Sequence, residues 1–241
     1  MRTDLQLSPW SVFGTGDCWD DDFFESIFFL GNGRMGIRGY LPMEPEDRPI
    51  QKGVYLAGIF GEIKPGITDF VNLPTPVYDS ILLDGEAGTL SSPIERCLDM
   101  KAVCFTARFS LTAKQKTVDV VYSRFLPKEH PALILQRLKF IPHENVGISV
   151  TSGLMTDSCN SPIPDDQTKE NTETIQLSLL EDTRAAPEGI TADFQVRGTG
   201  LSVRENVRFR STAFQFTGSK GTCAVYTADG QAGQTLILDK A

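Results

Sequence analysis

The sequence predicts an all-β fold of antiparallel strands, arranged as a sandwich or a barrel. Apolar and polar residues alternate with a period of two in several segments, which is typical of strands with one buried face. Turn residues separate these segments at intervals of roughly 8–15 residues, as in sandwiches and barrels. No window of about 11 residues carries the apolar stripe of a helix. The length of 241 residues suits one large β domain or two small domains.

Near the N-terminus, the segment 20–29 offers one short helical turn, with aspartates near its start. The string GNGRMG at 31–36 then satisfies G-x-G-x-x-G, the spacing of a dinucleotide-binding loop. That loop requires a helix whose N-terminal amides hold a pyrophosphate, but Gly39 and Pro42 follow too soon for such a helix. We therefore predict a sharp turn between two strands, with glycine adopting a positive φ.

The middle of the chain is divided into strands by turn residues. Asp84-Gly85 lies between the apolar string SILL and EAGTL, which predicts a hairpin turn. Proline-containing breaks at 127–131 and 142–145 divide the stretch 117–154 into three strands.

The C-terminal half repeats the same pattern. The runs 146–154, 190–196 and 203–210 alternate apolar with polar residues, so each has one face suited to a core. Gly198-Thr199-Gly200 separates two of these strands, and Asp229-Gly230 ends another. The polar stretch between Cys159 and Glu173, with two prolines, is predicted as a long mobile loop.

Charge and hydropathy exclude several classes of partner. The formal net charge is −8, and binding to phosphate backbones needs a local excess of Lys and Arg, so we predict no nucleic-acid partner. The best basic cluster, Arg204, Arg208 and Arg210, is interrupted by Glu205 and is read as a solvated strand face. No segment approaches the ~18–20 apolar residues that span a bilayer, and no signal peptide is evident, so no membrane partner is predicted.

The residues that bind metals show no suitable spacing. The five cysteines are widely spaced and form no C-x-x-C motif, while His130 and His143 each neighbour a proline. We expect no metal and no cofactor, and reduced thiols in a cytoplasmic protein. The acidic run from Asp17 to Glu25 lacks the spacing of an EF-hand loop, so a solvated charge cluster is the preferred reading.

Catalytic motifs are also weak. No G-x-S-x-G elbow is present, and neither a Ser/His/Asp triad nor Cys/His catalysis is supported. An acid/base pair of carboxylates stays open, because it depends on a separation in space of roughly 5–10 Å. Five aromatic residues could stack on sugar rings or belong to the core, and these are Trp10, Trp19, Tyr40, Tyr55 and Tyr78.

An ordered series of motifs resembles the N-terminal region of glycoside hydrolase family 65, which includes maltose, trehalose and kojibiose phosphorylases and related hydrolases. The series begins with ESIFFLGNGRMGIRG at 25–39 and covers about residues 23–155. It continues with GVYLAGIFG at 53–61, DFVNLP at 69–74, ILLDGE at 81–86, RCLDM at 96–100 and YSRF at 122–125.

The resemblance implies an architecture and a division of labour. It implies that residues 1–241 form one large antiparallel β super-sandwich with few short helices, and that the catalytic (α/α)6 barrel of the family is absent from this chain. The parent enzyme would be an inverting α-glucoside phosphorylase or hydrolase that acts on α-linked glucose disaccharides, with phosphate in the phosphorylases. The catalytic Glu belongs to the barrel, so no catalytic residue is assigned here and the isolated chain is expected to be inactive.

The resemblance also implies partners for this chain. Its own barrel is the expected partner, and the domain would pack on it and shape the edge of the active site. A homodimer is a further expected possibility. Asn32, Arg34, Arg38 and Asn72 are candidates for the surface that meets the barrel, or they hold a local network. Two alternatives stay open, a stand-alone carbohydrate-binding module and a structural or dimerisation domain.

Overall fold

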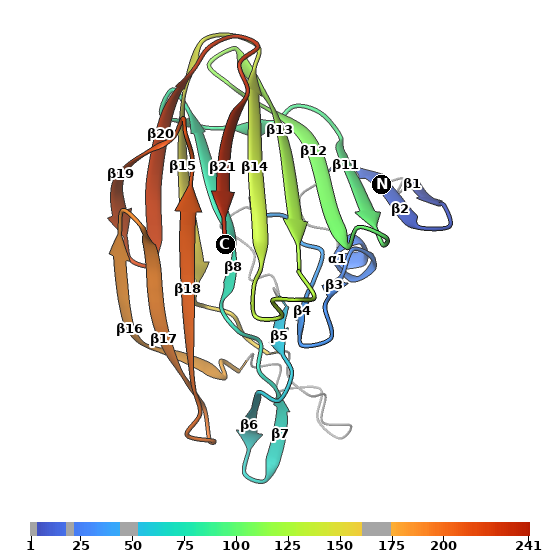
Figure 1. Ribbon diagram of the computed structural model, residues 1–241, viewed down its shortest axis with the longest axis vertical. Coiled ribbons are helices and arrows are strands. Elements are labelled where there is room, and N and C mark those ends of the chain that lie inside the picture. The colour runs from blue at the N-terminus through green and yellow to red at the C-terminus, as the bar shows by residue number, and fades with distance from the viewer. Residues whose placement is uncertain (1–3, 18–21, 44–52, 161–174) are drawn as a thin grey trace, which may run out of the picture.

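The computed structural model describes residues 4–17, 22–43, 53–160 and 175–241, and it shows an all-β sandwich (Figure 1). The fold class predicted from the period-two pattern is therefore confirmed. Cys18, Trp19, Asp20, Asp21 and almost all of the polar stretch after Asn160 lie outside the described residues, so those expectations stay untested.

The larger layer is an 11-stranded antiparallel sheet. Its strands follow the order β1 (Asp4–Leu7), β2 (Ser11–Gly16), β11 (Ile94–Asp99), β12 (Cys104–Ala113), β13 (Lys116–Phe125), β14 (Leu135–Pro142), β21 (Leu236–Lys240), β18 (Ser202–Arg210), β17 (Gly189–Val196) and β16 (Ser178–Ala186), and β10 (Thr89–Leu90) pairs with β12. Neighbouring strands β12 and β13 are joined by a tight turn and pair in full register, from Cys104 opposite Phe125 to Ala113 opposite Lys116.

The second layer has five strands. They follow the order β19 (Gln215–Lys220), β20 (Cys223–Gly230), β15 (Val146–Met155), β8 (Thr75–Leu83) and β9 (Glu86–Ala87). Alternate residues of β8 and β15 are buried, because the period-two pattern turns their apolar side chains toward the core. Phe105 and Phe140 of the large sheet and Val150 of the second sheet are almost fully buried in that core.

Short elements lie beside and below the two large sheets in Figure 1. They are the helix α1 (Asp22–Ile27), the three-stranded sheet of β3 (Leu30–Gly31), β4 (Met35–Ile37) and β5 (Val54–Leu56), and the hairpin of β6 (Phe60–Lys64) and β7 (Ile67–Phe70). Helix α1 lies near the ends of β11 and β12, and β5, β6 and β7 lie at the bottom of the figure. Gly33 has φ 91° in the turn between β3 and β4. The glycine string is therefore a strand–turn–strand element, as predicted, because β4 and not a helix follows the turn directly.

Turn chemistry locates most strand boundaries correctly. Asp84 and Gly85 have φ values of 49° and 82°, the left-handed pair of a type I′ turn, and they join β8 to β9. The breaks expected around 127–131 and 142–145 separate β13, β14 and β15. The turn between β12 and β13 was not predicted, because Lys114 and Gln115 adopt φ values of 49° and 62° without a glycine to mark them.

Strand β18 departs from the predicted burial. Of its three apolar residues expected on the core face, Val207 is buried, whereas Val203 and Phe209 are only half-buried. Both half-buried side chains still pack against the core. Strand β21 pairs with β18 at Phe209 and Arg210, and residues Val203 to Val207 border a pocket.

Candidate functional site

The four residues expected at a functional surface lie around one small sheet. Asn32 and Arg34 belong to the turn between β3 and β4, Arg38 follows β4, and Asn72 contacts β5. The structure therefore brings these residues to the same end of the sandwich, although 40 positions separate the first from the last in the sequence.

Asn32 closes the β3–β4 turn and ties it to the loop after β13. Its Oδ1 atom accepts hydrogen bonds from the main-chain N–H groups of Arg34 at 3.1 Å and Met35 at 2.8 Å. Its Nδ2 atom donates to the carbonyls of Pro127 at 3.2 Å and Pro131 at 3.1 Å. All the hydrogen bonds that this amide commonly makes are thus used within the fold.

Arg38 and Asn72 also hold local structure. Arg38 forms an ion pair with Glu25 of α1, with 3.3 Å between Nη2 and Oε2, and Glu25 is buried. Asn72 is buried and accepts a hydrogen bond from the Val54 N–H at 3.0 Å, while its Nδ2 atom donates to the Cys159 carbonyl at 3.0 Å. Of the four candidates, Arg34 is the one whose side chain is exposed.

A pocket of about 390 Å³ lies beside this small sheet. Its floor comes from the short sheet and the second layer, and its walls come from β18 and the loop before β14. The lining residues are Met35, Val54, Leu56, Leu73, Pro76, Ala132, Leu133, Ile134, Leu154, Val203, Arg204, Glu205, Asn206, Val207 and Ala241. We call this space the Glu205 pocket.

Glu205 places a carboxyl group in these apolar surroundings. The residue is half-buried as a whole, whereas its Oε1 atom is buried and has no hydrogen-bond partner among the described residues. Burial raises the pKa of Glu205 to about 8. The sequence analysis treated Glu205 only as an interruption of a basic cluster. The available signal was its position two residues from both Val203 and Val207, which puts it on their face of the strand.

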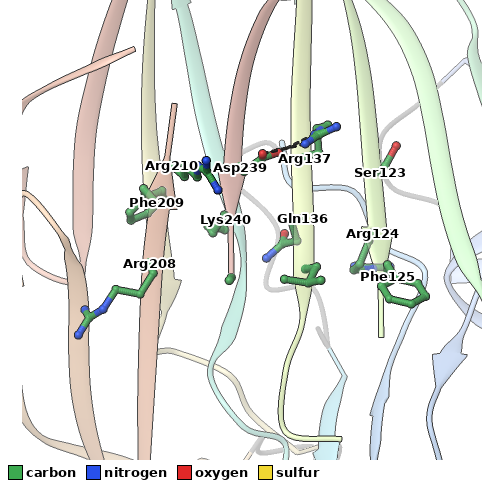
Figure 2. Close-up of a pocket in the computed structure, with 12 residues that line it drawn as sticks. Ser123, Arg124, Phe125, Gln136, Arg137, Arg208, Phe209, Arg210, Asp239 and Lys240 are labelled. Carbon is green, nitrogen blue, oxygen red and sulfur yellow. Dashed lines mark hydrogen bonds and ion pairs between the residues drawn. The ribbon is translucent and has the colours of Figure 1, made fainter. Parts of the chain in front are cut away.

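The basic residues of β18 lie on the opposite face, as expected for a solvated strand face. Arg204 forms a bidentate ion pair with Asp193, at 2.6 and 2.8 Å. Arg208 and Arg210 line a separate groove of about 510 Å³ on the outer side of the large sheet (Figure 2). In the same groove Arg137 pairs with Asp239, so the local charge is partly balanced.

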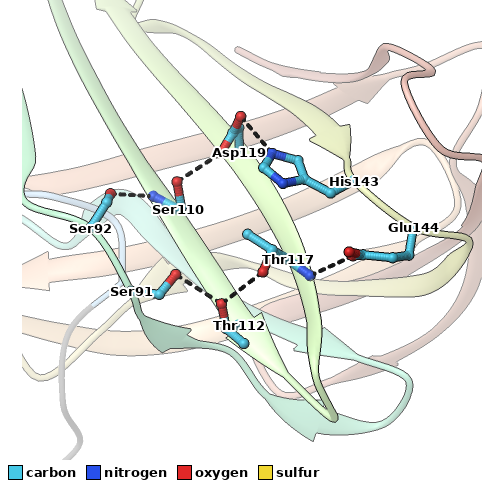
Figure 3. A network of polar contacts seen from close by, with 8 residues as sticks. All are labelled: Ser91, Ser92, Ser110, Thr112, Thr117, Asp119, His143 and Glu144. Carbon is cyan, nitrogen blue, oxygen red and sulfur yellow. Dashed lines mark hydrogen bonds and ion pairs between the residues drawn. The ribbon is translucent and has the colours of Figure 1, made fainter.

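A Ser–Asp–His chain lies on β12, β13 and the loop after β14 (Figure 3). Ser110 Oγ donates to Asp119 at 2.7 Å, and the other Asp119 oxygen lies 2.9 Å from His143 Nε2. The hydrogen bond to Asp119 raises the pKa of His143. Because Asp119 stands between the two, the imidazole does not contact the hydroxyl and cannot take its proton directly. The network therefore joins strands and is not a nucleophilic triad.

Other candidate groups are placed as follows. Within the described ranges, no group of three or more His, Cys, Asp or Glu residues could hold a metal ion, and the four cysteines there form no disulfide. Tyr40 is buried in the core, Tyr55 and Tyr78 are half-buried, and Trp10 is 62% exposed. In the part of the chain that the structure covers, no helix is long and apolar enough to cross a bilayer.

Comparison with known proteins decides the family. Residues 20–241 match the model of the N-terminal domain of glycosyl hydrolase family 65. The chain belongs to that family. The glycine turn after β3 and the DGE hairpin after β8, which carried the resemblance, are thus features of a family 65 N-terminal domain.

Relatives of this family 65 chain are named as phosphorylases. It is 23% identical over 234 residues to a kojibiose phosphorylase of Thermoanaerobacter brockii, an alignment that covers 90% of this chain and 30% of the relative. It is 28% identical over 195 residues to a kojibiose phosphorylase of Halothermothrix orenii, covering 77% of this chain and 23% of the relative. A trehalose 6-phosphate phosphorylase of Lactococcus lactis is 25% identical over 111 residues, which is 42% of this chain and 14% of that protein.

A solved structure confirms the fold. The structure named "Putative kojibiose phosphorylase from human microbiome" superposes with a TM-score of 0.75 at 15% identity, and the match covers 98% of this chain and 32% of that chain. The family 65 chain described here therefore spans about a third or less of the length of the relatives it matches.

Proposed function

We propose that this chain is the non-catalytic N-terminal domain of a phosphorylase or hydrolase that acts on α-linked glucose disaccharides, in which it packs on a catalytic barrel and shapes the edge of the active site. The observation that carries this proposal is the family match over residues 20–241, in a chain that spans only 30% and 23% of the length of two kojibiose phosphorylases. We also propose a cytoplasmic location, which the free thiols of the described cysteines support.

The described residues contain little that could perform the chemistry. Inverting glycosidases place two carboxyl groups roughly 6.5–9.5 Å apart across a sugar-binding cleft. The Glu205 pocket has a single carboxyl group in its side-chain lining, and the outer groove is lined by arginines together with Asp239 and Lys240. This distribution of charged groups favours a non-catalytic role for the chain.

An activity assay of the isolated chain tests the proposal. The chain is incubated with inorganic phosphate and kojibiose, maltose or trehalose, and the release of glucose is measured. We expect no release above the buffer blank, with a complete kojibiose phosphorylase as the positive control. Turnover that is proportional to the concentration of the chain would show that it carries its own catalytic groups.

The role at the edge of the active site has its own test. Arg34 is exposed on the β3–β4 turn, next to residues whose side chains are committed to the fold. In the full gene product, Arg34→Ala is expected to lower kcat/KM for phosphorolysis about tenfold, which is roughly 1.4 kcal/mol of transition-state stabilisation. The matched control is Lys128→Ala, which removes an exposed cation from the neighbouring loop. Equal kcat/KM values for both variants and the parent would contradict the role of Arg34.

A stand-alone carbohydrate-binding module is the second candidate, and exposed aromatic residues favour it. Trp10 is 62% exposed, and Phe60 and Phe70 stack at 4.5 Å between ring centroids on an exposed hairpin. Aromatic faces suit the C–H groups of sugar rings. Calorimetric titration with maltose, trehalose and longer glucans separates the two candidates, because a module gives saturable heat that Trp10→Ala abolishes.

The possible homodimer is tested separately. The same exposed aromatic residues could form an interface between two copies of the chain. Light scattering over a range of concentrations gives the mass of the particle directly. A constant monomer mass would remove dimerisation from the proposal.

A further inference from the structure

The Glu205 pocket combines a mostly apolar lining with one carboxyl oxygen that has no hydrogen-bond partner among the described residues. Twelve of its fifteen lining residues are Met, Val, Leu, Ile, Pro or Ala, and the volume is about 390 Å³. This volume falls within the range of small-molecule sites, roughly 300–1,000 Å³. Residues Val203 to Val207 of β18 form one side of the pocket.

Among the residues that the structure describes, none supplies a counter-charge to the carboxyl group in the pocket. Arg204 also lines the pocket, but its guanidinium makes two hydrogen bonds to Asp193 on the outer face. The carbonyl oxygen of Ala241, which also lines the pocket, accepts a hydrogen bond from the Arg208 N–H at 2.8 Å. The buried Oε1 atom of Glu205 is therefore an acceptor without a donor among the described residues.

A sugar is a poor fit for this pocket. A disaccharide presents hydroxyl groups on every side, and each hydroxyl buried without a partner costs about 1–3 kcal/mol. The side chains of the pocket supply one free carboxyl group against a mostly apolar lining. A ligand that fits must have an apolar body and a single strong donor.

Charge decides which donor fits best. An ammonium group donates hydrogen bonds and also supplies the missing positive charge, and the attraction between opposite charges is stronger in apolar surroundings than in water. A neutral hydroxyl supplies only the hydrogen bond. The thioether of Met35 and the aliphatic walls suit an unbranched alkyl chain.

We propose that the Glu205 pocket is a binding site for an organic ammonium ion, in which the alkyl chain fills the apolar space and the ammonium group pairs with the Glu205 carboxylate. The ion can be a free alkylamine or the side chain of a lysine. The site is independent of the proposed role of the chain in disaccharide phosphorolysis.

Binding of n-hexylammonium to the 241-residue chain tests the proposal. Titration is followed by calorimetry and by NMR shifts of the methyl groups of Leu56, Leu133 and Val207. We expect saturable binding, at least tenfold weaker binding of 1-hexanol, and at least tenfold weaker binding to Glu205→Gln. Because burial raises the pKa of Glu205 to about 8, binding at pH 7 requires the carboxyl to release a proton, and affinity is expected to rise up to tenfold per pH unit between pH 6 and 8.

Control variants and a second ligand test whether binding of n-hexylammonium depends on Glu205. Glu181→Gln removes an exposed carboxylate from β16 and is expected to bind n-hexylammonium like the parent chain. The melting temperature and circular dichroism of Glu205→Gln establish that this variant is folded, and the pH profile of the parent tests the same group without any substitution. Nα-acetyl-lysine N-methylamide distinguishes the two sources, since its binding supports a lysine side chain and its failure, with n-hexylammonium bound, supports a free amine. Absence of saturable binding, or equal affinities for 1-hexanol and n-hexylammonium, would overturn the proposal.

Discussion

Glu205 makes the stability of the fold depend on pH. Its folded pKa of about 8 lies above the unfolded value of about 4.5, so the folded state holds its proton more tightly than the unfolded state does. The free energy of unfolding should therefore fall as pH rises from about 4.5 to 8, with a slope approaching 1.4 kcal/mol per pH unit from this group. Glu205→Gln is expected to remove that contribution, as measured by urea unfolding at pH 5, 6.5 and 8. A parent and a variant with parallel pH profiles would show that the carboxyl titrates normally.

Lys240 and Asp79 form a buried ion pair. Lys240 of β21 is 5% exposed, and its Nζ atom reaches Asp79 Oδ1 at 3.1 Å and Ser152 Oγ at 2.8 Å in the other sheet. Desolvation lowers the pKa of Lys240 and raises that of Asp79, so the two charges depend on each other.

Removal of one partner should be costly. Lys240→Met leaves the Asp79 carboxyl buried without its cation, and we expect a loss of about 3–5 kcal/mol in the free energy of unfolding. The double variant Lys240→Met with Asp79→Leu should recover most of this loss, because no unpaired charge remains. Denaturant unfolding of the two variants and the parent measures both effects, and additive losses in the double variant would contradict the pairing.

At the level of elements, the turn between β12 and β13 is a site of backbone strain. Lys114 and Gln115 are both left-handed, a conformation that costs a non-glycine residue roughly 1–2 kcal/mol. Two contacts to Asp84 stabilise the turn, because Lys114 Nζ donates to the Asp84 carbonyl at 2.7 Å and Lys116 pairs with the Asp84 carboxylate. These contacts join the β12–β13 hairpin to the β8–β9 hairpin.

Glycine should relieve that strain. Gln115 is exposed, so its side chain contributes little packing. We expect Gln115→Gly to stabilise the fold by about 0.5–1 kcal/mol, and Gln115→Val to destabilise it by at least as much, because a β-branched residue tolerates positive φ poorly. Thermal unfolding measures both. Destabilisation by Gln115→Gly would show that chain entropy outweighs the strain.

At the level of the whole molecule, the chain passes several times between the two sheets, so that strands of both sheets alternate along the sequence. The chain leaves the second sheet after β9, returns for β15, leaves for β16 to β18, returns for β19 and β20, and ends in β21 of the large sheet. Neither sheet can therefore complete its strand order while the other is unfolded. Hairpins joined by local turns, such as β12–β13, do not change this dependence.

This topology predicts a single cooperative unfolding transition of the isolated chain. The midpoints followed by far-ultraviolet circular dichroism and by tryptophan fluorescence should coincide, and the calorimetric and van't Hoff enthalpies should agree. Lys240→Met should lower the midpoint without splitting the transition. Two resolved transitions would indicate that the layers fold as separate units.

Local chemistry made much of the fold predictable. The alternation in β15 and β17, the type I′ turn at Asp84-Gly85 and the strand–turn–strand reading of the glycine string follow from side-chain period and from glycine at positive φ. The β12–β13 turn did not follow, because contacts from Asp84 thirty positions away stabilise it. The ordered motif series carried the resemblance to the family, and the family match over residues 20–241 confirms it.

What the sequence alone determined is the class of the fold, the short helix α1, most strand boundaries and the family, because these depend on residues close together in the chain. The tertiary structure decided which side chains are free to act. Asn32 and Asn72 use their amides within the fold, and Arg38 pairs with Glu25. The Oε1 atom of Glu205 has no donor in the described part of the chain. Whether a polar group is satisfied depends on neighbours that are distant in sequence, and strand periodicity specifies only the face on which the group lies.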